Sequence, residues 1–207
     1  MKLEESKTYE NLARAFAAEC QARVRYEFIE YGARYNGYKA LAEVIDKVVY
    51  QEFNHARMLY TALHNNSKMP EIENINICAG YPFKEKWELV NNLRIAADDE
   101  DADAQSYEEF AKIAKDEGFD EIAELMMMIQ KVEEHHKRLF LELYDQMKNK
   151  TIYKKDKKVK WICPDCGYVH CGDEAPDECP LCKAKQGSFE LILPPEFASY
   201  CINTKSK

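Results

Sequence analysis

The segment QEFNHARML at residues 51–59 recurs as VEEHHKRLF at residues 132–140, with the same Glu-x-x-His pattern. A further glutamate precedes each copy of the motif by 33 residues, and apolar neighbours repeat at the same offset of 81 positions. The matched pairs are Glu19 with Glu100, Glu52 with Glu133, and His55 with His136. A polar triad kept in register with its apolar neighbours predicts a duplicated helical hairpin whose two copies face each other.

The region between residues 5 and 147 is nearly free of proline and glycine. Its interruptions lie at residues 35–37, 65–82 and 117–118. They leave four predicted helices of roughly 28 to 32 residues, far longer than the usual helix of about 11 or 12. The two short breaks predict antiparallel hairpins, and the longer break suits a crossover along a four-helix bundle.

The repeated glutamates and histidines fall inside the apolar stripes of these helices. Because residues three apart on a helix share a face, each Glu-x-x-His pair can point into the core together. Four carboxylates and two imidazoles would then converge on one buried point, which a core tolerates only if cations neutralise the charge. Several oxygens with one imidazole per ion suit iron or manganese better than a soft metal. The sequence therefore predicts a pair of metal ions.

The overall charge excludes some classes of function. A formal net charge of -8 and a pI near 5.3 argue against a nucleic-acid-binding protein, because no basic face offsets the acidity. The sequence contains no run of about 18 apolar residues, so it predicts no membrane-spanning helix. The opening MKLEESKTYE lacks the apolar centre of a signal peptide. We therefore expect a cytoplasmic protein.

Four of the eight cysteines form a second candidate metal site near the C-terminus. Cys163, Cys166, Cys179 and Cys182 have the spacing C-x2-C-x12-C-x2-C, which is typical of two knuckles that clamp one tetrahedral metal. Spacing alone does not separate zinc from iron. We expect a bundle domain over residues 1–148, a lysine-rich solvated linker over 149–158, and a small cysteine domain with its tail over 159–207.

With these residues in place, the chain resembles the rubrerythrin family over nearly its whole length. The segments AFAAECQARVRY and NLRIAADDEDADAQSYEEFAKIAKDEGF, together with the two motif stretches, resemble the family's four helices. The segment WICPDCGYVHCGDEAPDECPLC resembles its rubredoxin-like domain. The resemblance implies an all-α ferritin-like four-helix bundle and a small, mostly irregular and β domain. It also implies two iron ions in the bundle and one iron on the four cysteines.

The resemblance carries the family's ligand roles to positions of this chain. The matching positions are Glu19, Glu52, His55, Glu100, Glu133 and His136. Where the family has one more glutamate, this chain has Asp103, which is shorter by one methylene. The chain is also one residue shorter than the family pattern nearby. Alignment from the other side would place Asp99 and Ala102 at the two ligand positions, but the apolar stripe favours Glu100 and Asp103. Tyr26 and Tyr107 resemble tyrosines near the metals, although two ordinary core tyrosines would fit equally.

The implied activity is the reduction of hydrogen peroxide to water in defence against oxidative stress. Electrons would enter through the rubredoxin-like centre and come ultimately from NADH through rubredoxin or separate reductase proteins. The family also implies a homodimer with a head-to-tail arrangement. Two alternatives remain: a ferroxidase that handles or stores iron, and a binding module that holds zinc. The appended cysteine domain argues against storage, because storage requires no dedicated electron inlet.

Overall fold

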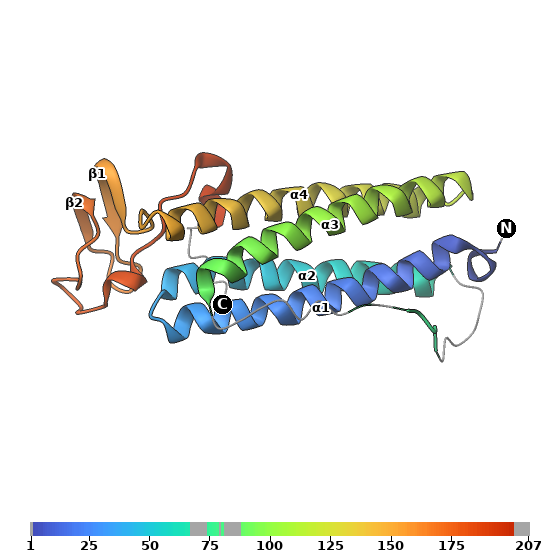
Figure 1. Cartoon of the computed structure of the whole chain (residues 1–207), viewed down its shortest axis with the longest axis horizontal. Helices are drawn as coiled ribbons and strands as arrows, with labels where there is room; N and C mark the ends of the chain where they lie inside the picture. The colour runs from blue at the N-terminus through green and yellow to red at the C-terminus, as the bar shows by residue number, and fades with distance from the viewer. Residues whose placement is uncertain (1, 67–73, 79, 81–87, 201–207) are drawn as a thin grey trace.

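The computed structural model describes residues 2–66, 74–78, 80 and 88–200 of the chain. Four long helices dominate it: α1 (Lys7–Tyr35), α2 (Lys39–Asn66), α3 (Leu89–Asp116) and α4 (Asp120–Lys148). As Figure 1 shows, α1 and α2 form one antiparallel layer and α3 and α4 the other. The predicted four-helix bundle is confirmed. The expected crossover at residues 65–82 falls mostly outside the described residues.

The two hairpins turn in the same way. Gly37 and Gly118 have φ angles of 82° and 85°, the left-handed conformation that favours glycine after a helix. In each turn the residue after the glycine donates its N–H to a carbonyl in the last helical turn. Tyr38 donates to Ala33 over 2.9 Å, and Phe119 donates to Ala114 over 2.8 Å. These pairs are again 81 positions apart, so the duplication extends to the helix ends.

The start of α1 is fixed by two side chains. The hydroxyl of Ser6 accepts a hydrogen bond from the Tyr9 N–H over 3.1 Å, as an N-cap residue does. The carboxylate of Glu117, after α3, accepts the N–H groups of Lys7 and Thr8 over 3.0 and 2.9 Å. A carboxylate at a helix N-terminus also interacts favourably with the helix dipole. The contact therefore ties the two hairpins together at one end of the bundle.

Buried apolar residues form two separate clusters along the bundle. One cluster, which includes Leu12, Leu59 and Met126, fills the end near the N-terminus. The other includes Ile29 and Phe140 and continues into the cysteine domain. The repeated glutamates and histidines occupy the layer between the two clusters and are all buried.

The C-terminal region packs against the end of the bundle where α1 turns into α2 (Figure 1). It contains an antiparallel pair of strands, β1 (Lys154–Ile162) and β2 (Val169–Glu174), and two 3-10 segments, Gln186–Ser188 and Pro195–Tyr200. Gly187 lies so close to the bundle that a Cβ atom there would come within 1.8 Å of the Gly37 carbonyl oxygen. The hydroxyl of Tyr153 also donates to the Gly187 carbonyl over 3.0 Å.

The charged residues of the lysine-rich segment are mostly exposed, as the charge pattern predicted, but part of the segment is a strand and not only a spacer. Strand β1 begins at Lys154, and the residues before it, Ile152 and Tyr153, are only 6% exposed. Strand β1 begins with five consecutive charged residues, of which Lys154, Asp156, Lys157 and Lys158 are exposed, and its backbone pairs with β2. The charge run hid a strand. The proposed domain boundaries at residues 148 and 159 remain a prediction.

No helix within the described ranges is long and apolar enough to cross a membrane.

Candidate metal centres

The middle layer of the bundle collects carboxylates and imidazoles from all four helices. They form two groups, in each of which one ligand atom per residue lies within 4.8 Å of all the others. The first group is Glu19, Glu52, His55 and Glu133; the second is Glu52, Glu100, Glu133 and His136. Glu52 and Glu133 belong to both groups. Two cations held by these groups would therefore share two carboxylates.

In the first group, the Nδ1 atom of His55 faces three carboxylates. It lies 2.9 Å from Glu133 Oε1, 3.3 Å from Glu19 Oε2 and 3.6 Å from Glu52 Oε2. A single N–H can make a good hydrogen bond to only one of these oxygens. A cation at this point could bind all of them together with the imidazole nitrogen.

The second group repeats this arrangement around His136. Its Nδ1 atom lies 2.9 Å from Glu52 Oε1, 3.0 Å from Glu133 Oε2 and 3.6 Å from Glu100 Oε1. The other ring nitrogen, Nε2, lies 2.9 Å from the side-chain oxygen of Gln51. The ring is thus oriented with Nδ1 toward the carboxylates. The predicted duplication is visible in the geometry of the site.

The donor set fits a pair of divalent cations. Four carboxylate oxygens in the described part of the chain are buried and make no hydrogen bond: Glu19 Oε2, Glu52 Oε1, Glu100 Oε1 and Glu133 Oε1. A buried polar atom without a partner is costly, and a buried charge more so. Cations would satisfy these oxygens. Oxygen-rich ligation with one imidazole per ion favours iron or manganese.

The protonation equilibria of the cluster respond to the same excess of negative charge. Burial raises the pKa of Glu19 and of Glu100, and the charges of Glu52 and Glu133 raise both further. Burial alone would lower the pKa of His136, but the charges of Glu100 and Glu52 outweigh it and raise that pKa. At Glu19, Glu100 and His136 the shifts favour the protonated form, which reduces the net negative charge of the cluster.

The structure also decides between the two alignments of the third helix. Glu100 faces the cluster, whereas Asp99 forms a buried salt bridge with Arg25 of α1. Asp103 is in neither metal-binding group. Burial raises the pKa of Asp103 to about 7, with a further contribution from the charges of the cluster glutamates. The role of Asp103 as a ligand remains a prediction.

Two tyrosines lie beside the cluster. The hydroxyl of Tyr107 donates a hydrogen bond to Glu19. The ring of Tyr26 packs on Phe140 with the ring centroids 4.9 Å apart. Burial raises the pKa of both hydroxyls, and nearby carboxylates raise it further, chiefly Glu100 for Tyr26 and Glu19 for Tyr107. Both tyrosines therefore stay protonated at neutral pH, and Tyr107 orients a ligand residue.

The four cysteines converge as the spacing predicts. The Sγ atoms of Cys163, Cys166, Cys179 and Cys182 all lie within 4.8 Å of one another. Burial raises the pKa of Cys163 to about 12, whereas the backbone N–H groups of Leu181 and Cys182 outweigh burial at Cys179 and lower its pKa to about 7. Metal binding requires all four as thiolates, which a bound cation would stabilise.

Each cysteine knuckle ends in a residue with a positive φ angle. Gly167 follows the first pair with φ 77°, and Lys183 follows the second pair with φ 67°. A glycine at this point is a recognisable turn signal, but a lysine is not. The second turn could therefore not be read from residue types alone.

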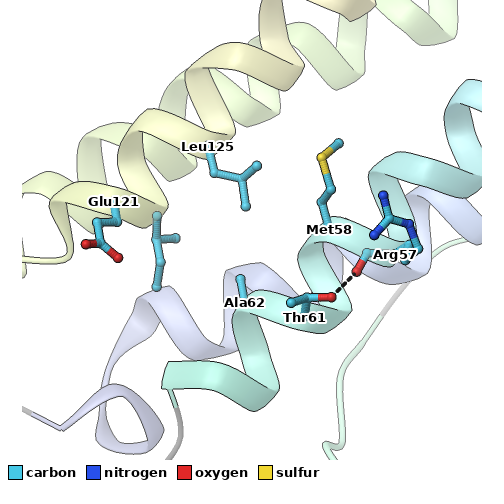
Figure 2. A pocket seen from close by; sticks show the side chains of 7 residues that line it. Arg57, Met58, Thr61, Ala62, Glu121 and Leu125 are labelled. Atoms are coloured by element: carbon cyan, nitrogen blue, oxygen red, sulfur yellow. Dashed lines mark hydrogen bonds between the residues drawn. The ribbon is translucent and has the colours of Figure 1, made fainter.

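A surface hollow of about 460 Å³ lies between α2 and α4 at the bundle end away from the cysteines (Figure 2). Its lining is Arg57, Met58, Thr61, Ala62, Glu121, Ile122 and Leu125. The Thr61 hydroxyl donates to the Arg57 carbonyl over 2.8 Å, which leaves it occupied within its own helix. None of the lining residues belongs to either metal-binding group.

Two contacts around the cluster were not foreseen from the sequence: the Gln51–His136 hydrogen bond and the Arg25–Asp99 salt bridge. Each joins two helices far apart in sequence. The available signal for Gln51 was a polar residue where the second repeat has an apolar one, Val132.

Both family models that match the chain describe parts of the same protein family. The chain matches the model of the rubrerythrin family over residues 10–144, with a second match over 91–162. It matches the model of the rubredoxin-like domain of rubrerythrin over residues 161–190.

The similarity to individual relatives extends over nearly the whole chain. Rubrerythrin of Clostridium perfringens is 36% identical over 191 residues, which are 92% of this chain and 96% of the relative. Rubrerythrin of Porphyromonas gingivalis is 35% identical over 186 residues, which are 89% and 90% of the two chains.

Solved structures show the same architecture. The fully reduced, all-ferrous structure of nigerythrin has a TM-score of 0.59 and 25% identity, with 89% of this chain and 86% of that chain covered. A bacterioferritin of Desulfovibrio desulfuricans, at 23% identity, has a TM-score of 0.57, with 69% and 81% covered. That second similarity concerns the fold alone. The prediction of a ferritin-like bundle with a small cysteine-bearing region is confirmed.

Proposed function

The chain belongs to the rubrerythrin family, and from that premise we propose that it reduces hydrogen peroxide to water at the carboxylate–histidine cluster. The O–O bond breaks, two electrons and two protons are consumed, and both oxygen atoms leave as water. An iron held by Cys163, Cys166, Cys179 and Cys182 would supply the electrons one at a time. The enzyme would thus protect the cell against oxidative stress.

One observation carries this proposal: two metal-binding groups share Glu52 and Glu133 in a chain that also carries a four-cysteine site. An iron pair bound in the cluster would supply two electrons together and stabilise negative charge on both peroxide oxygens. A dedicated cysteine site in the same chain offers a place for the one-electron carrier that must restore them.

The protein's own groups prepare this chemistry. Tyr107 keeps its proton on the hydroxyl oxygen and donates it in a hydrogen bond to Glu19, which holds one carboxylate in place. The apolar clusters on both sides of the layer exclude bulk water. In such a site electrostatic interactions are stronger than in water, so the fixed carboxylates and imidazoles have a larger effect on the charge that they face.

The test is stopped-flow mixing of the reduced, iron-loaded full chain with hydrogen peroxide. Glu52→Ala and Glu133→Ala should abolish oxidation of the bundle iron, while the red colour of a ferric four-cysteine site survives. Cys179→Ser should spare a single turnover and stop sustained turnover. Cys171→Ser is the matched control, because Cys171 is exposed and outside the cluster, and its rates should equal wild type. Normal steady-state rates in both the glutamate and the Cys179 variants would refute the proposal.

Iron oxidation and storage is the second candidate, because it uses the same kind of bundle. It predicts that added ferrous iron accumulates as a ferric core under dioxygen and that Cys179→Ser has no effect. A peroxide rate well above the dioxygen rate, together with a need for Cys179, would favour peroxide reduction.

We also propose, from the family, that a rubredoxin or an NADH-dependent reductase supplies the electrons and that the chain works in the cytoplasm as a head-to-tail homodimer. Reconstitution with such donors and measurement of the molar mass in solution would test these points.

A further inference from the structure

The two imidazoles of the cluster are held differently. His136 uses both ring nitrogens: Nδ1 faces the carboxylates of Glu52 and Glu133, and Nε2 lies 2.9 Å from the Gln51 side-chain oxygen. Gln51 belongs to α2 and His136 to α4, so the contact crosses from one hairpin to the other. The His136 side chain is completely buried.

This contact selects one tautomer of the ring. An amide oxygen only accepts hydrogen bonds, so the Nε2 atom facing it must carry the proton. In a neutral imidazole the lone pair is then on Nδ1, the atom that points at the carboxylate cluster. A histidine can bind a metal only through a nitrogen with a free lone pair. Gln51 therefore presents His136 in the form that a cation in the second group requires.

The duplication does not repeat Gln51. The position equivalent to Gln51 in the second repeat is Val132, which directly precedes Glu133 as Gln51 precedes Glu52. A valine side chain has no hydrogen-bonding atom. His55 therefore cannot receive the corresponding bond from the corresponding position, although its Nδ1 faces three carboxylates as that of His136 does.

We propose that Gln51 is a positioning residue that fixes the tautomer and orientation of His136 and so makes the His136 group the tighter of the two metal positions. The proposal rests on the metal pair of the proposed function, but not on peroxide as its substrate. Hydrogen-bond partners of metal-bound histidines typically contribute about 10- to 100-fold to metal affinity. Only one of the two positions should show this contribution.

The first measurement is a titration of the metal-free full chain with Mn²⁺, with free Mn²⁺ followed by electron paramagnetic resonance. Mn²⁺ prefers oxygen and imidazole ligands and disfavours four thiolates, so it reports the bundle. Wild type should show a tighter and a weaker position. Gln51→Leu should weaken the tighter position by about 10- to 100-fold and leave the other unchanged.

The second measurement is the ¹⁵N histidine spectrum of the Zn²⁺-saturated full chain, in which the bound metal is diamagnetic. Wild type should show a slowly exchanging Nε2 proton on His136, and Gln51→Leu should lose that protection. Gln51→Glu keeps an acceptor and should restore both the signal and the affinity. A merely structural role for Gln51 would not produce this rescue.

Gln130→Leu is the matched control, because Gln130 is a buried glutamine of α4 that donates to Glu134. It should change neither measurement. If Gln51→Leu does not fold, Gln51→Asn withdraws the amide by one methylene and tests the same contact. Unchanged Mn²⁺ affinities, or equal weakening of both positions, would overturn the inference. If Gln51→Leu weakens the tighter Mn²⁺ position but the wild-type chain does not reduce peroxide, the role of Gln51 is supported and only the proposed activity is rejected.

Discussion

Replacing Asp99 by alanine should destabilise the bundle strongly, because Arg25 loses a buried ion-pair partner. The side chains of Arg25 and Asp99 are only 5% and 10% exposed, so water cannot easily replace the lost contact. Removal of one partner from a buried ion pair costs about 3–5 kcal/mol. For a chain of 207 residues, each kcal/mol lowers the unfolding midpoint by about 2–4 °C, so the expected drop is roughly 6–20 °C.

The assay is thermal unfolding of the full chain followed by far-ultraviolet circular dichroism, with and without a chelator. The matched variant is Arg25→Met with Asp99→Leu, which removes both charges at similar volume and should lie within about 1 kcal/mol of wild type. A drop below about 2 °C for Asp99→Ala would show that the buried ion pair contributes little to stability. So would a double variant as unstable as the single one, because the cost would then not come from the loss of one partner of the buried ion pair.

Three further substitutions test other contacts. Gly187→Ala places a Cβ atom against the backbone of the α1–α2 turn, so it should loosen the cysteine domain by about 1–3 kcal/mol and increase its cleavage by protease. Tyr107→Phe removes the hydrogen bond to Glu19 and should lower the unfolding free energy in denaturant by about 1.5–3 kcal/mol. Burial raises the pKa of Glu117, but the hydrogen bonds from Thr8 outweigh it and hold that pKa below its ordinary value. The stabilisation by Glu117 is therefore present above the unfolded-state pKa and lost as pH falls through the lower folded-state value. The difference in melting midpoint between wild type and Glu117→Gln should shrink below about pH 4, and a difference that grows on acidification would contradict this assignment.

The repeat made most of the fold and the site predictable. Glu52 and His55 could be predicted as site residues because a second copy of the motif in the same register rarely arises by chance. The long stretches without proline predicted the helices. The cysteine spacing was sufficient for the same reason: four ligands at fixed separations serve one tetrahedral ion. In both cases the prediction rests on the spacing of residues along the chain and not on contacts in the folded structure.

The remaining features depend on contacts between distant segments. The apolar stripe already favoured Glu100 over its neighbour Asp99, but only the packing of α1 against α3 shows that Asp99 pairs with Arg25. Strand β1 was missed because a lysine run resembles solvated chain until its pairing with β2 is known. Lys183 adopts a left-handed turn that its side chain does not signal.

The shared glutamates make each half of the bundle incomplete. The first hairpin supplies Glu19, Glu52 and His55 but takes Glu133 from the second, which in turn takes Glu52 from the first. An isolated hairpin could therefore bind an ion properly only after meeting another hairpin. Each of the two metal positions is therefore complete only when both hairpins are docked against each other.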